Sequence, residues 1–548
     1  MRASPGQGLA WPIMEMHWAT IWESIADAIP DRPAVTNGDV TRSWAEYDQR
    51  AARVAAALAA HGLGPDSKVG LYLYNGNEYL EAHYGALKMR GVPINVNYRY
   101  LDEELRYLLD NADAEALIFH RSLADRVRRV VNRLPGLRLL VEVDDGEGTP
   151  LGDAVGYEQL LADHGPMPRM ERGEDDVYML YTGGTTGMPK GVMFRIADLA
   201  RSLLLKPVEP RELASDALAM HDSGYHPTSV TGAPLMHGTG LWMGALLPHT
   251  GGGHVVTLTS RAFDPHELLA AIERHRCTRN TVVGDAFSRP IVRAIDEAIA
   301  AGRPYDLSSL RFTISSGAMW TNEVKQALLD RVPHMTLEDS MGSTEGGMAS
   351  QTTVRGEQSE TATFTAEPTT KVFDEFDREI EPGSDRSGMV ATSSLVPIGY
   401  FKDPEKSAHT FRTIDGVRYS FPGDMAKIAA DGSLILLGRG SNVINSAGEK
   451  IFPEEVEEAV KRIAGVDDCL VVGVDDERFG QAVRAVVSLA PGVTLDEDSV
   501  IAAFKEQLAG FKAPKRVVFV DVVPRAPNGK ADYTTARRLA QQAGDQAS

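Results

Sequence analysis

Short apolar runs alternate with helix-period segments over residues 17–145. The apolar runs lie at 68–74, 92–97 and 116–120, and the helix-period segments lie at 43–62, 77–90 and 102–112. This alternation is typical of a parallel sheet with helices on its faces. A capping box, Ser43 with Glu46, marks the start of the first of these helices. We therefore expect a doubly wound α/β sheet in this region.

The chain is too long for one hydrophobic core. It has 548 residues, whereas a single core stops growing at roughly 250–300 residues. Residues 195–440 continue as mixed α/β sequence, and a compact pattern follows: a charged helix from Pro453, strands at 469–474 and 483–489, a helix at 498–508 and a strand at 517–520. We expect an α/β fold with a large N-terminal domain of mixed and parallel doubly wound sheets over 17–440, and a small α+β C-terminal domain over 441–548.

Charge and composition exclude several classes of protein. The formal net charge is −20, which argues against a nucleic-acid partner because phosphate backbones select basic faces. The two cysteines, Cys277 and Cys469, fit no metal or redox spacing, so a reducing cytoplasm is the expected location. No apolar run approaches the roughly 20 residues of a membrane span.

A glycine- and hydroxyl-rich loop over 181–191 is built to hold phosphate. Its glycines allow close approach of the backbone to an anion, while threonine hydroxyls and one lysine add donors and charge; these residues are Thr182, Gly183, Gly184, Thr185, Thr186, Gly187 and Lys190. Met188 and Pro189 separate the last glycine from Lys190, which differs from the spacing of a P-loop NTPase. A strand at 177–181 leads into the loop and places it at a strand's carboxyl end, where open α/β sheets bind ligands.

Other polar clusters follow at long intervals, and each alone has an ordinary structural interpretation. A segment at 339–345 ends in Thr344 and Glu345, and a carboxylate there is a suitable ligand for a hard cation. A turn at 421–424 ends in Asp424, which could accept two ribose hydroxyls. Arg439 follows Gly438, and Lys530 ends a turn near the end of the chain.

Taken in this order and spacing, these segments resemble the adenylate-forming superfamily of acyl-CoA synthetases, peptide-synthetase adenylation domains and beetle luciferases. The resemblance covers residues 17–535, including segments at 95–99 and 104–108. The motifs at 181–187, 416–419 and 449–455 look most like those of bacterial fatty-acyl and steroid-acid CoA synthetases.

The resemblance implies a role for each cluster. The loop residues named above would hold the β- and γ-phosphates of ATP, Thr344 would touch the α-phosphate, and Glu345 would bind Mg²⁺. Lys530 would bridge the acid's carboxylate and the α-phosphate. The remaining nucleotide and coenzyme A contacts would come from Ser316, Gly317, Ala318 and Met341 at adenine, Asp424 and Arg439 at ribose, and Gly448 at pantetheine.

The resemblance also implies that the small domain is mobile and rotates between two half-reactions. The family's hinge position after the Gly-Arg pair is commonly Asp or Lys, and here it is Ser441. Met341 stands where the family commonly has an aromatic residue. A thioether can still pack on a ring, so neither departure removes a charged group.

Three segments, 237–244, 284–288 and 317–320, match the family's acid-binding region. Glycines at 238, 240 and 244 would open space along one wall, and an adaptable apolar lining would come from Met236, Met243, Met319 and Met341. Ordinary core packing of these methionines is an equal alternative. Asp285 is the only nearby candidate for the acidic anchor that amino-acid-activating domains use for an α-amino group, and its expected role is capping or a structural hydrogen bond. His237 could orient the carboxylate.

The sequence therefore predicts an ATP-dependent, AMP-forming acid–thiol ligase that uses Mg²⁺ and coenzyme A on a hydrophobic carboxylic acid. That acid would be a medium- or long-chain fatty acid or a bulky steroid-type acid. Alternatives are an enzyme that loads a carrier protein, an aryl-acid CoA ligase, and an inactive nucleotide-binding relative. The expected partner is the small-molecule acid, with no nucleic acid and no membrane span, and a homodimer is one oligomeric state open to the chain.

Overall fold

The computed structural model describes residues 16–184, 187–204, 209–357, 360–446, 449–476, 480–508, 510–526 and 529–545. The chain divides into two compact units. Unit 1 comprises residues 1–179, 193–227 and 246–255, and unit 2 comprises 180–192, 228–245 and 256–548. Among the described residues, no helix is long and apolar enough to cross a membrane.

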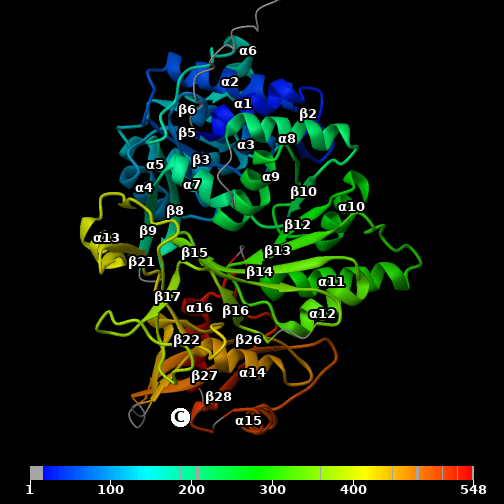
Figure 1. Ribbon diagram of the computed structural model, residues 1–548, viewed down its shortest axis with the longest axis vertical. Coiled ribbons are helices and arrows are strands. Elements are labelled where there is room, and N and C mark those ends of the chain that lie inside the picture. Colours follow the sequence, from blue (N-terminus) through cyan, green and yellow to red (C-terminus); the bar gives the residue numbers. More distant parts are fainter. Residues whose placement is uncertain are drawn as a thin grey trace, which may run out of the picture. The chain divides into compact units, whose positions relative to one another are not determined.

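Unit 1 contains a parallel sheet of five strands in the order β4-β3-β5-β6-β7. The strands are β3 (Lys68–Tyr72), β4 (Val92–Asn95), β5 (Ala114–His120), β6 (Leu139–Val143) and β7 (Val155–Gly156). All five residues of β3 are buried, as expected for a strand covered on both faces. The expected strands and the doubly wound arrangement are thus confirmed (Figure 1).

Helices of unit 1 begin where the local sequence predicts. Ser43 caps α2 (Trp44–Ala60), and Glu46 returns a hydrogen bond to the Ser43 amide, so the capping box is present. A Cβ at Gly85 would lie 2.7 Å from Val54 Cβ, so the missing side chain lets α3 approach α2 closely. The other helices are α1 (Trp18–Ala28), α3 (Asn77–Lys88), α4 (Asp102–Asn111), α5 (Ala124–Val130), α6 (Tyr157–Asp163), α7 (Ile196–Leu203), α8 (Pro210–Asp222) and α9 (Leu247–Thr250).

Unit 2 begins with a parallel layer that becomes antiparallel at one hairpin. β10 (Thr228–Thr231), β12 (Arg279–Val282), β13 (Phe312–Ser316) and β14 (Thr336–Ser343) pair in parallel. β14 then pairs antiparallel with β15 (Gly346–Thr353). The apolar core of this layer includes residues of α10 (Pro265–His275), α11 (Gly284–Ala300) and α12 (Asn322–Arg331), and Figure 1 shows α11 beside α12.

The antiparallel part continues from β15 in the order β16-β23-β22-β18-β21-β20, with β17 paired to β18. These strands are β16 (Thr363–Ala366), β17 (Thr370–Phe373), β18 (Gly388–Thr392), β20 (Phe411–Ile414), β21 (Val417–Ser420), β22 (Asp424–Ile428) and β23 (Leu434–Arg439). Helix α13 (Pro404–Thr410) precedes β20.

The C-terminal part of unit 2 is a sheet packed on both faces. β26 (Val466–Asp476) and β27 (Gly480–Leu489) pair antiparallel, and β28 (Arg516–Phe519) joins β27 in parallel. Alternate β26 residues enter different cores because side chains of a strand point to opposite faces. Cys469 and Val471 join the core that includes Val456 of α14 (Pro453–Lys461), and Leu470 joins Ala536 of α16 (Tyr533–Asp545).

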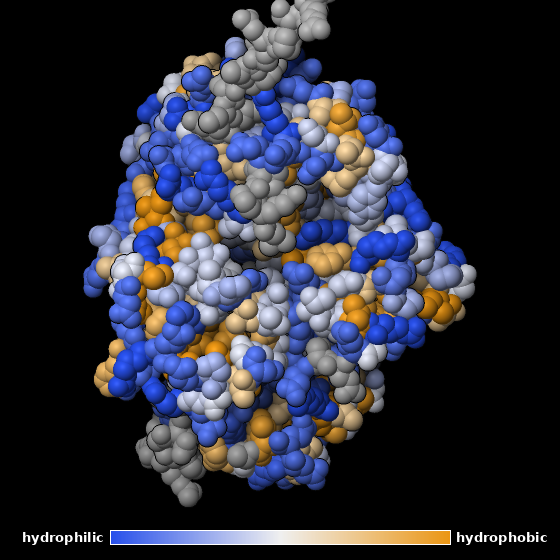
Figure 2. Space-filling view, in the orientation of Figure 1, coloured by the Kyte–Doolittle hydropathy of each residue, from blue (hydrophilic) through white to orange (hydrophobic). Residues whose placement is uncertain are grey.

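The helices and strands of the C-terminal part confirm the expected α+β class. Helix α15 (Glu497–Lys505) lies close to its expected range, and β24 (Ile444–Ser446) and β25 (Glu449–Ile451) complete the sheet. Helix α16 was not predicted from the sequence. The boundary at residue 440 stays a prediction. The face in Figure 2 mixes hydrophilic and hydrophobic side chains, as suits a chain with 43% hydrophobic residues.

Candidate functional site

The predicted phosphate-binding segment 181–191 lies largely on two strands, β8 (Val177–Gly184) and β9 (Gly187–Arg195), so the expectation of a loop over this whole range is wrong. The two strands are neighbours in a three-stranded sheet with β19 (Gly399–Tyr400). Lys190 therefore lies on a strand, whereas the glycine-rich loop of a P-loop NTPase opens a helix. This difference agrees with the spacing argument from the sequence.

Glu345 projects from the two-residue tip, Thr344–Glu345, of the β14–β15 hairpin. Below the tip, buried Lys325 of α12 donates hydrogen bonds from Nζ to Asp339 Oδ2 at 2.9 Å and to Gln351 Oε1 at 2.6 Å. Lys325 thus bridges one residue of each strand of the hairpin that carries Glu345.

Tyr400 contacts two of the predicted site residues. Its hydroxyl donates to Glu345 Oε1 at 2.8 Å, and Lys190 Nζ lies 4.8 Å from the centroid of its ring. Burial and, next, the Glu345 charge raise the pKa of Tyr400, so the phenol stays protonated. A lysine from the phosphate loop and the hairpin carboxylate therefore share one neighbour.

Lys190 titrates unusually low for a lysine. Burial is the largest cause, neighbouring Lys406 adds to it, and together they lower the pKa of Lys190 to about 8 although Glu345 opposes the shift. A phosphate arriving at this ammonium would compensate the repulsion between the two lysines. Lys190 is thus a cation whose surroundings favour an anion.

Asp424 and Arg439 face each other on neighbouring strands. They are register partners in the β22–β23 ladder, and Arg439 Nε lies 3.4 Å from Asp424 Oδ1. Burial raises the pKa of Asp424, and the charges of Arg439 and Lys530 oppose that shift. The pair therefore presents a carboxylate and a guanidinium together, as sequence reasoning expected for a ribose contact.

Lys530 approaches the same residues from the C-terminal part of the chain. A Cβ at Gly317 would lie 3.2 Å from Lys530 Cε, so the glycine makes room for this side chain. Lys530 is exposed to solvent, yet desolvation by the surrounding protein and, next, Arg439 lower its pKa, whereas Glu345 and Asp424 raise it. Its charge is felt by both predicted acidic groups.

His237 lies beside this lysine as a neutral imidazole. Burial and, to a smaller degree, the charge of Lys530 lower the pKa of His237 to about 3. Its Nε2 is buried and has no hydrogen-bond partner among the described residues. Such an atom normally has a partner, so a ligand oxygen is a suitable one.

Asp285 has the structural role expected from sequence. Its carboxylate accepts hydrogen bonds from the Thr321 amide at 2.8 Å and the Thr321 hydroxyl at 2.9 Å, and Arg289 Nη2 lies 3.2 Å away. With these partners it is not an anchor for an α-amino group.

Two of the three glycines expected to open the acid pocket have a different function. A Cβ at Gly240 would lie 2.2 Å from the Pro234 carbonyl oxygen, and one at Gly244 would lie 2.8 Å from Thr231 Cβ. These glycines permit close packing of the π-helical turn Thr239–Leu246, so the expectation of open space there is wrong. At Gly238 a Cβ would make ordinary contacts of 3.5 Å or more.

The other residues predicted to contact the nucleotide have surroundings that do not test this role. The Ser316 carbonyl is 3.5 Å from the Thr239 hydroxyl, and Ala318 packs against the core of the parallel layer. Met341 is 5% exposed and belongs to a core with Met348 and Phe364, so its contact with adenine stays a prediction. Thr182 and Gly183 lie near the end of β8, Gly184 is its last residue, and Gly187 is the first residue of β9. Three predicted residues lie outside the described ranges: Thr185, Thr186 and Gly448.

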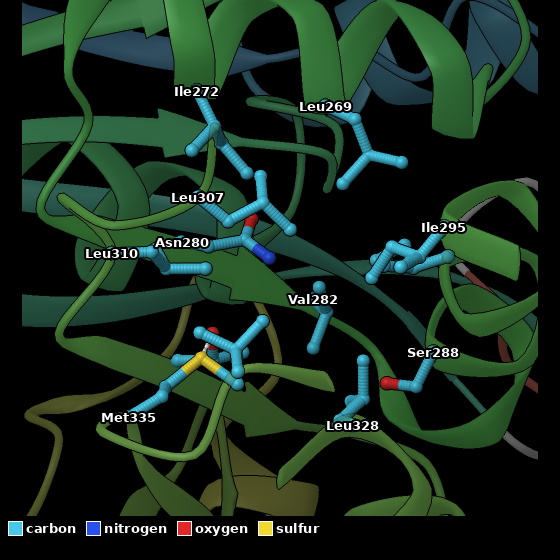
Figure 3. Close-up of a pocket in the computed structure, with 13 residues that line it drawn as sticks. Leu269, Ile272, Asn280, Val282, Ser288, Ile295, Leu307, Leu310, Leu328 and Met335 are labelled. Carbon is cyan, nitrogen blue, oxygen red and sulfur yellow. Dashed lines mark hydrogen bonds between the residues drawn. The ribbon is translucent and has the colours of Figure 1, made fainter. Parts of the chain in front are cut away.

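A small cavity of about 10 Å³ lies in the core of unit 2 (Figure 3). This is room for about one water molecule. Asn280 Oδ1 and Ser288 Oγ, which have no partner among the described residues, belong to lining residues. Ser288 also ends the predicted acid-binding segment 284–288, so the cavity lies behind that segment. Its lining comprises Leu269, Ile272, Asn280, Val282, Ser288, Ile291, Ile295, Leu307, Leu310, Thr313, Leu328, Val332 and Met335.

Sequence reasoning missed Tyr400, Lys406 and Glu454. Tyr400 and Lys406 lie around the predicted cations, and their sequence surroundings carried no signal beyond an ordinary turn and helix start. Glu454 stood inside a recognised segment, but its burial was not predicted. The structure places its carboxylate against Gly438, where a Cβ would lie 2.0 Å from Glu454 Oε2.

Comparison with known proteins agrees with this geometry. The family model for AMP-binding enzymes matches residues 22–388, and the model for the C-terminal domain of AMP-binding enzymes matches 455–530. The medium/long-chain-fatty-acid–CoA/3-oxocholest-4-en-26-oate–CoA ligase of Mycolicibacterium smegmatis is 38% identical, over 96% of this chain and 97% of its own. The medium-chain acyl-CoA ligase Mig of Mycobacterium avium is 40% identical, over 94% and 97%.

A solved structure shows the same fold. The anthranilate CoA ligase AuaEII in complex with anthranoyl-AMP superposes with a TM-score of 0.84 at 21% identity, covering 98% of this chain and 99% of its own. The family matches over both parts of the chain and the relatives above show that the chain belongs to the AMP-binding enzyme family, in the acyl-CoA synthetase branch of the adenylate-forming superfamily.

Proposed function

We propose that this enzyme activates a hydrophobic carboxylic acid, either a medium- or long-chain fatty acid or a bulky steroid-type acid, and transfers it to coenzyme A. The observation that carries the proposal is the convergence of Glu345, Asp424 and Arg439 around Lys530, with Lys190 linked to Glu345 through Tyr400. The names of the M. smegmatis and M. avium relatives support this substrate class.

In the first half-reaction, a carboxylate oxygen of the acid would attack the α-phosphorus of ATP, and pyrophosphate would leave. Both reactants are anions, so cations must offset their repulsion in a water-poor site. Lys530 would contact the carboxylate and the α-phosphate, and His237 Nε2 would orient the carboxylate. Lys190 would hold the departing phosphates, and Asp424 and Arg439 would hold the ribose.

Glu345 fits a site for Mg²⁺ because it presents hard carboxylate oxygens at the tip of a hairpin. Tyr400 engages Oε1, and the second oxygen can face a cation. When bound, Mg²⁺ would neutralise phosphate charge. Its ligation in this chain remains part of the proposal.

In the second half-reaction, the thiolate sulfur of coenzyme A would attack the acyl carbonyl carbon, and AMP would leave with the electrons of the cleaved bond. Rotation of the small domain would withdraw Lys530 and bring Gly448 to the pantetheine. Transfer to the phosphopantetheine of a carrier protein has the same chemistry and is the second candidate acceptor.

The test is acid-dependent release of pyrophosphate and AMP across fatty, aromatic, bile-acid and steroid-side-chain acids, with coenzyme A or a phosphopantetheinyl carrier protein as acceptor. We expect turnover with bulky hydrophobic acids and coenzyme A. Lys530→Ala should lower pyrophosphate release at least about 100-fold because it removes charge stabilisation made at the transition state. The exposed Lys505→Ala variant, in the same part of the chain, is the control.

Three outcomes would count against the proposal. A preference for small aromatic acids would contradict the proposed class of bulky hydrophobic substrates. Thioester formation on the carrier protein alone would show that the carrier protein, and not coenzyme A, is the acceptor. Pyrophosphate release unchanged by Lys530→Ala would contradict the role of Lys530 in offsetting charge in the first half-reaction.

A further inference from the structure

Tyr400 connects two groups to which the proposed function gives different roles. Its hydroxyl donates to Glu345 Oε1 at 2.8 Å, and its ring lies 4.8 Å from Lys190 Nζ. The side chain is buried, with 4% of its surface exposed. A change at this one residue would therefore reach both the metal-binding carboxylate and the phosphate-binding cation.

Backbone contacts hold Tyr400 in place. Its amide donates to Ser407 Oγ at 2.8 Å, and its carbonyl accepts from the Asp403 amide at 3.2 Å. The next residue, Phe401, donates its amide to the Gly191 carbonyl at 2.8 Å. Because Gly191 follows Lys190 directly, the strand with Tyr400 and the strand with Lys190 are joined at this point.

Tyr400, Glu345 and Lys190 form a trio of a tyrosine, a carboxylate and a lysine. A similar trio in unit 1, Tyr84, Asp48 and Lys88, serves as a structural comparison. Tyr84 donates to Asp48 Oδ1, and Lys88 Nζ lies 4.6 Å from the Tyr84 ring centroid. There the lysine closes directly on the carboxylate, with Lys88 Nζ 2.7 Å from Asp48 Oδ1. Lys88 is buried and also lies 2.7 Å from Glu23 Oε1, so carboxylates compensate its charge directly.

The trio at Tyr400 is open by comparison. Within the described residues, Lys190 and Glu345 form no ion pair at 4.0 Å or less. The aromatic ring takes the place of the carboxylate as the neighbour of the ammonium, which a cation–π contact allows. The ammonium thus lies over the face of the phenol ring and the carboxylate lies at its hydroxyl, and a magnesium–phosphate group could bind to both.

We infer that Tyr400 is a positioning residue that holds the Glu345 carboxylate and the Lys190 ammonium apart, so that the metal and the phosphates it carries are received together. The hydroxyl fixes one carboxylate oxygen, and the ring supports the cation. This inference rests on the proposed function. It adds a residue outside both predicted motifs to the machinery for the departing pyrophosphate.

The experiment measures binding without turnover, in the absence of any acid. Mn²⁺ binding to the full-length enzyme with ATP is followed from the electron paramagnetic resonance signal of free Mn²⁺, and ATP binding is measured by calorimetry. Tyr400→Phe keeps the ring and removes the hydroxyl, so we expect about tenfold weaker Mn²⁺ binding and little change in ATP binding without metal. Tyr400→Leu also removes the ring and should weaken ATP binding.

Tyr84→Phe is the matched control because it removes the hydroxyl from the closed trio, and its Mn²⁺ affinity should equal that of the wild type. In turnover, Tyr400→Phe should need about tenfold more Mg²⁺ for half-maximal rate and should regain the wild-type kcat at saturating Mg²⁺. Wild-type Mn²⁺ affinity in Tyr400→Phe, or equal loss in Tyr84→Phe, would overturn the inference.

Failure of the proposed function would look different. In that case the wild type would bind Mn²⁺ and ATP but release no pyrophosphate with any acid, and the comparison of variants could still be made.

Discussion

Burial sets the protonation state of two residues of the predicted site, Lys190 and His237. It lowers the pKa of Lys190 to about 8 and that of His237 to about 3. At pH 7 the lysine is therefore mostly charged, whereas the imidazole is neutral. His237 can then offer a hydrogen bond to a carboxylate without adding a charge, and Lys190 supplies the cation for phosphate.

The lowered pKa of Lys190 leads us to expect that ATP binding to the free enzyme depends on pH. The protonated ammonium attracts phosphate, so affinity should be full below pH 8 and fall above it, by at most tenfold per pH unit for one proton. The measurement is calorimetric ATP binding between pH 6.5 and 9.5. In Lys190→Arg the fall should be absent because a guanidinium stays charged; an identical fall in both proteins would assign the titration to another group.

We expect the substitution His237→Ala to change the kinetics of the acid substrate rather than the binding of ATP. Its unpartnered Nε2 would lose the carboxylate contact in His237→Ala, and hydrogen bonds to charged groups are worth roughly 1.5–3 kcal/mol. We expect at least a tenfold lower kcat/KM for the acid in pyrophosphate release, with ATP affinity nearly unchanged. Unaltered acid kinetics would remove His237 from the site.

At the scale of elements, helix α14 begins with a half-buried acid, Glu454, whose Oε2 atom is buried. Glu454 lies in the first turn, and Tyr533 OH is 3.5 Å from its Oε1. Burial and, next, the nearby Glu457 raise the pKa of Glu454 to about 8. The side chain is therefore largely protonated at pH 7, and its Oε2 has no partner among the described residues.

The raised pKa makes stability depend on pH. The folded protein keeps this proton between about pH 4.5 and 8, whereas the unfolded chain loses it near 4.5, so the contribution is full below 4.5 and is lost as pH rises to 8. In Glu454→Gln this loss, at most about 1.4 kcal/mol per pH unit, should disappear. Denaturant unfolding at pH 5, 6.5 and 8 measures it, with the ion-paired Glu455→Gln as control; parallel curves would contradict the assignment.

At the scale of the whole molecule, local patterns predicted the elements well. The capping box at Ser43 and the alternating strands of the C-terminal sheet depend on neighbours in sequence, so their signal is present in short windows. The order of the polar motifs also sufficed to predict the family. The roles of individual site residues, including Thr344 and Lys530, stay predictions.

What the sequence could not show depends on distant contacts. The Tyr400 hydroxyl reaches Glu345 across 55 positions, and neither residue's surroundings reveal the other. Gly240 and Gly244 were misinterpreted for the same reason: a glycine fits open space and tight packing equally well, and only the positions of Pro234 and Thr231 decide between them.

Gly317 limits what the segment beside Lys530 can carry. A Cβ at this position would lie 3.2 Å from Lys530 Cε, so the lysine side chain would have to shift slightly to make room for it. The φ of +91° is a second obstacle, because residues with a side chain rarely adopt it. A substitution at 317 would therefore disturb the backbone after β13 and the path of Lys530 together, although it removes no charged group.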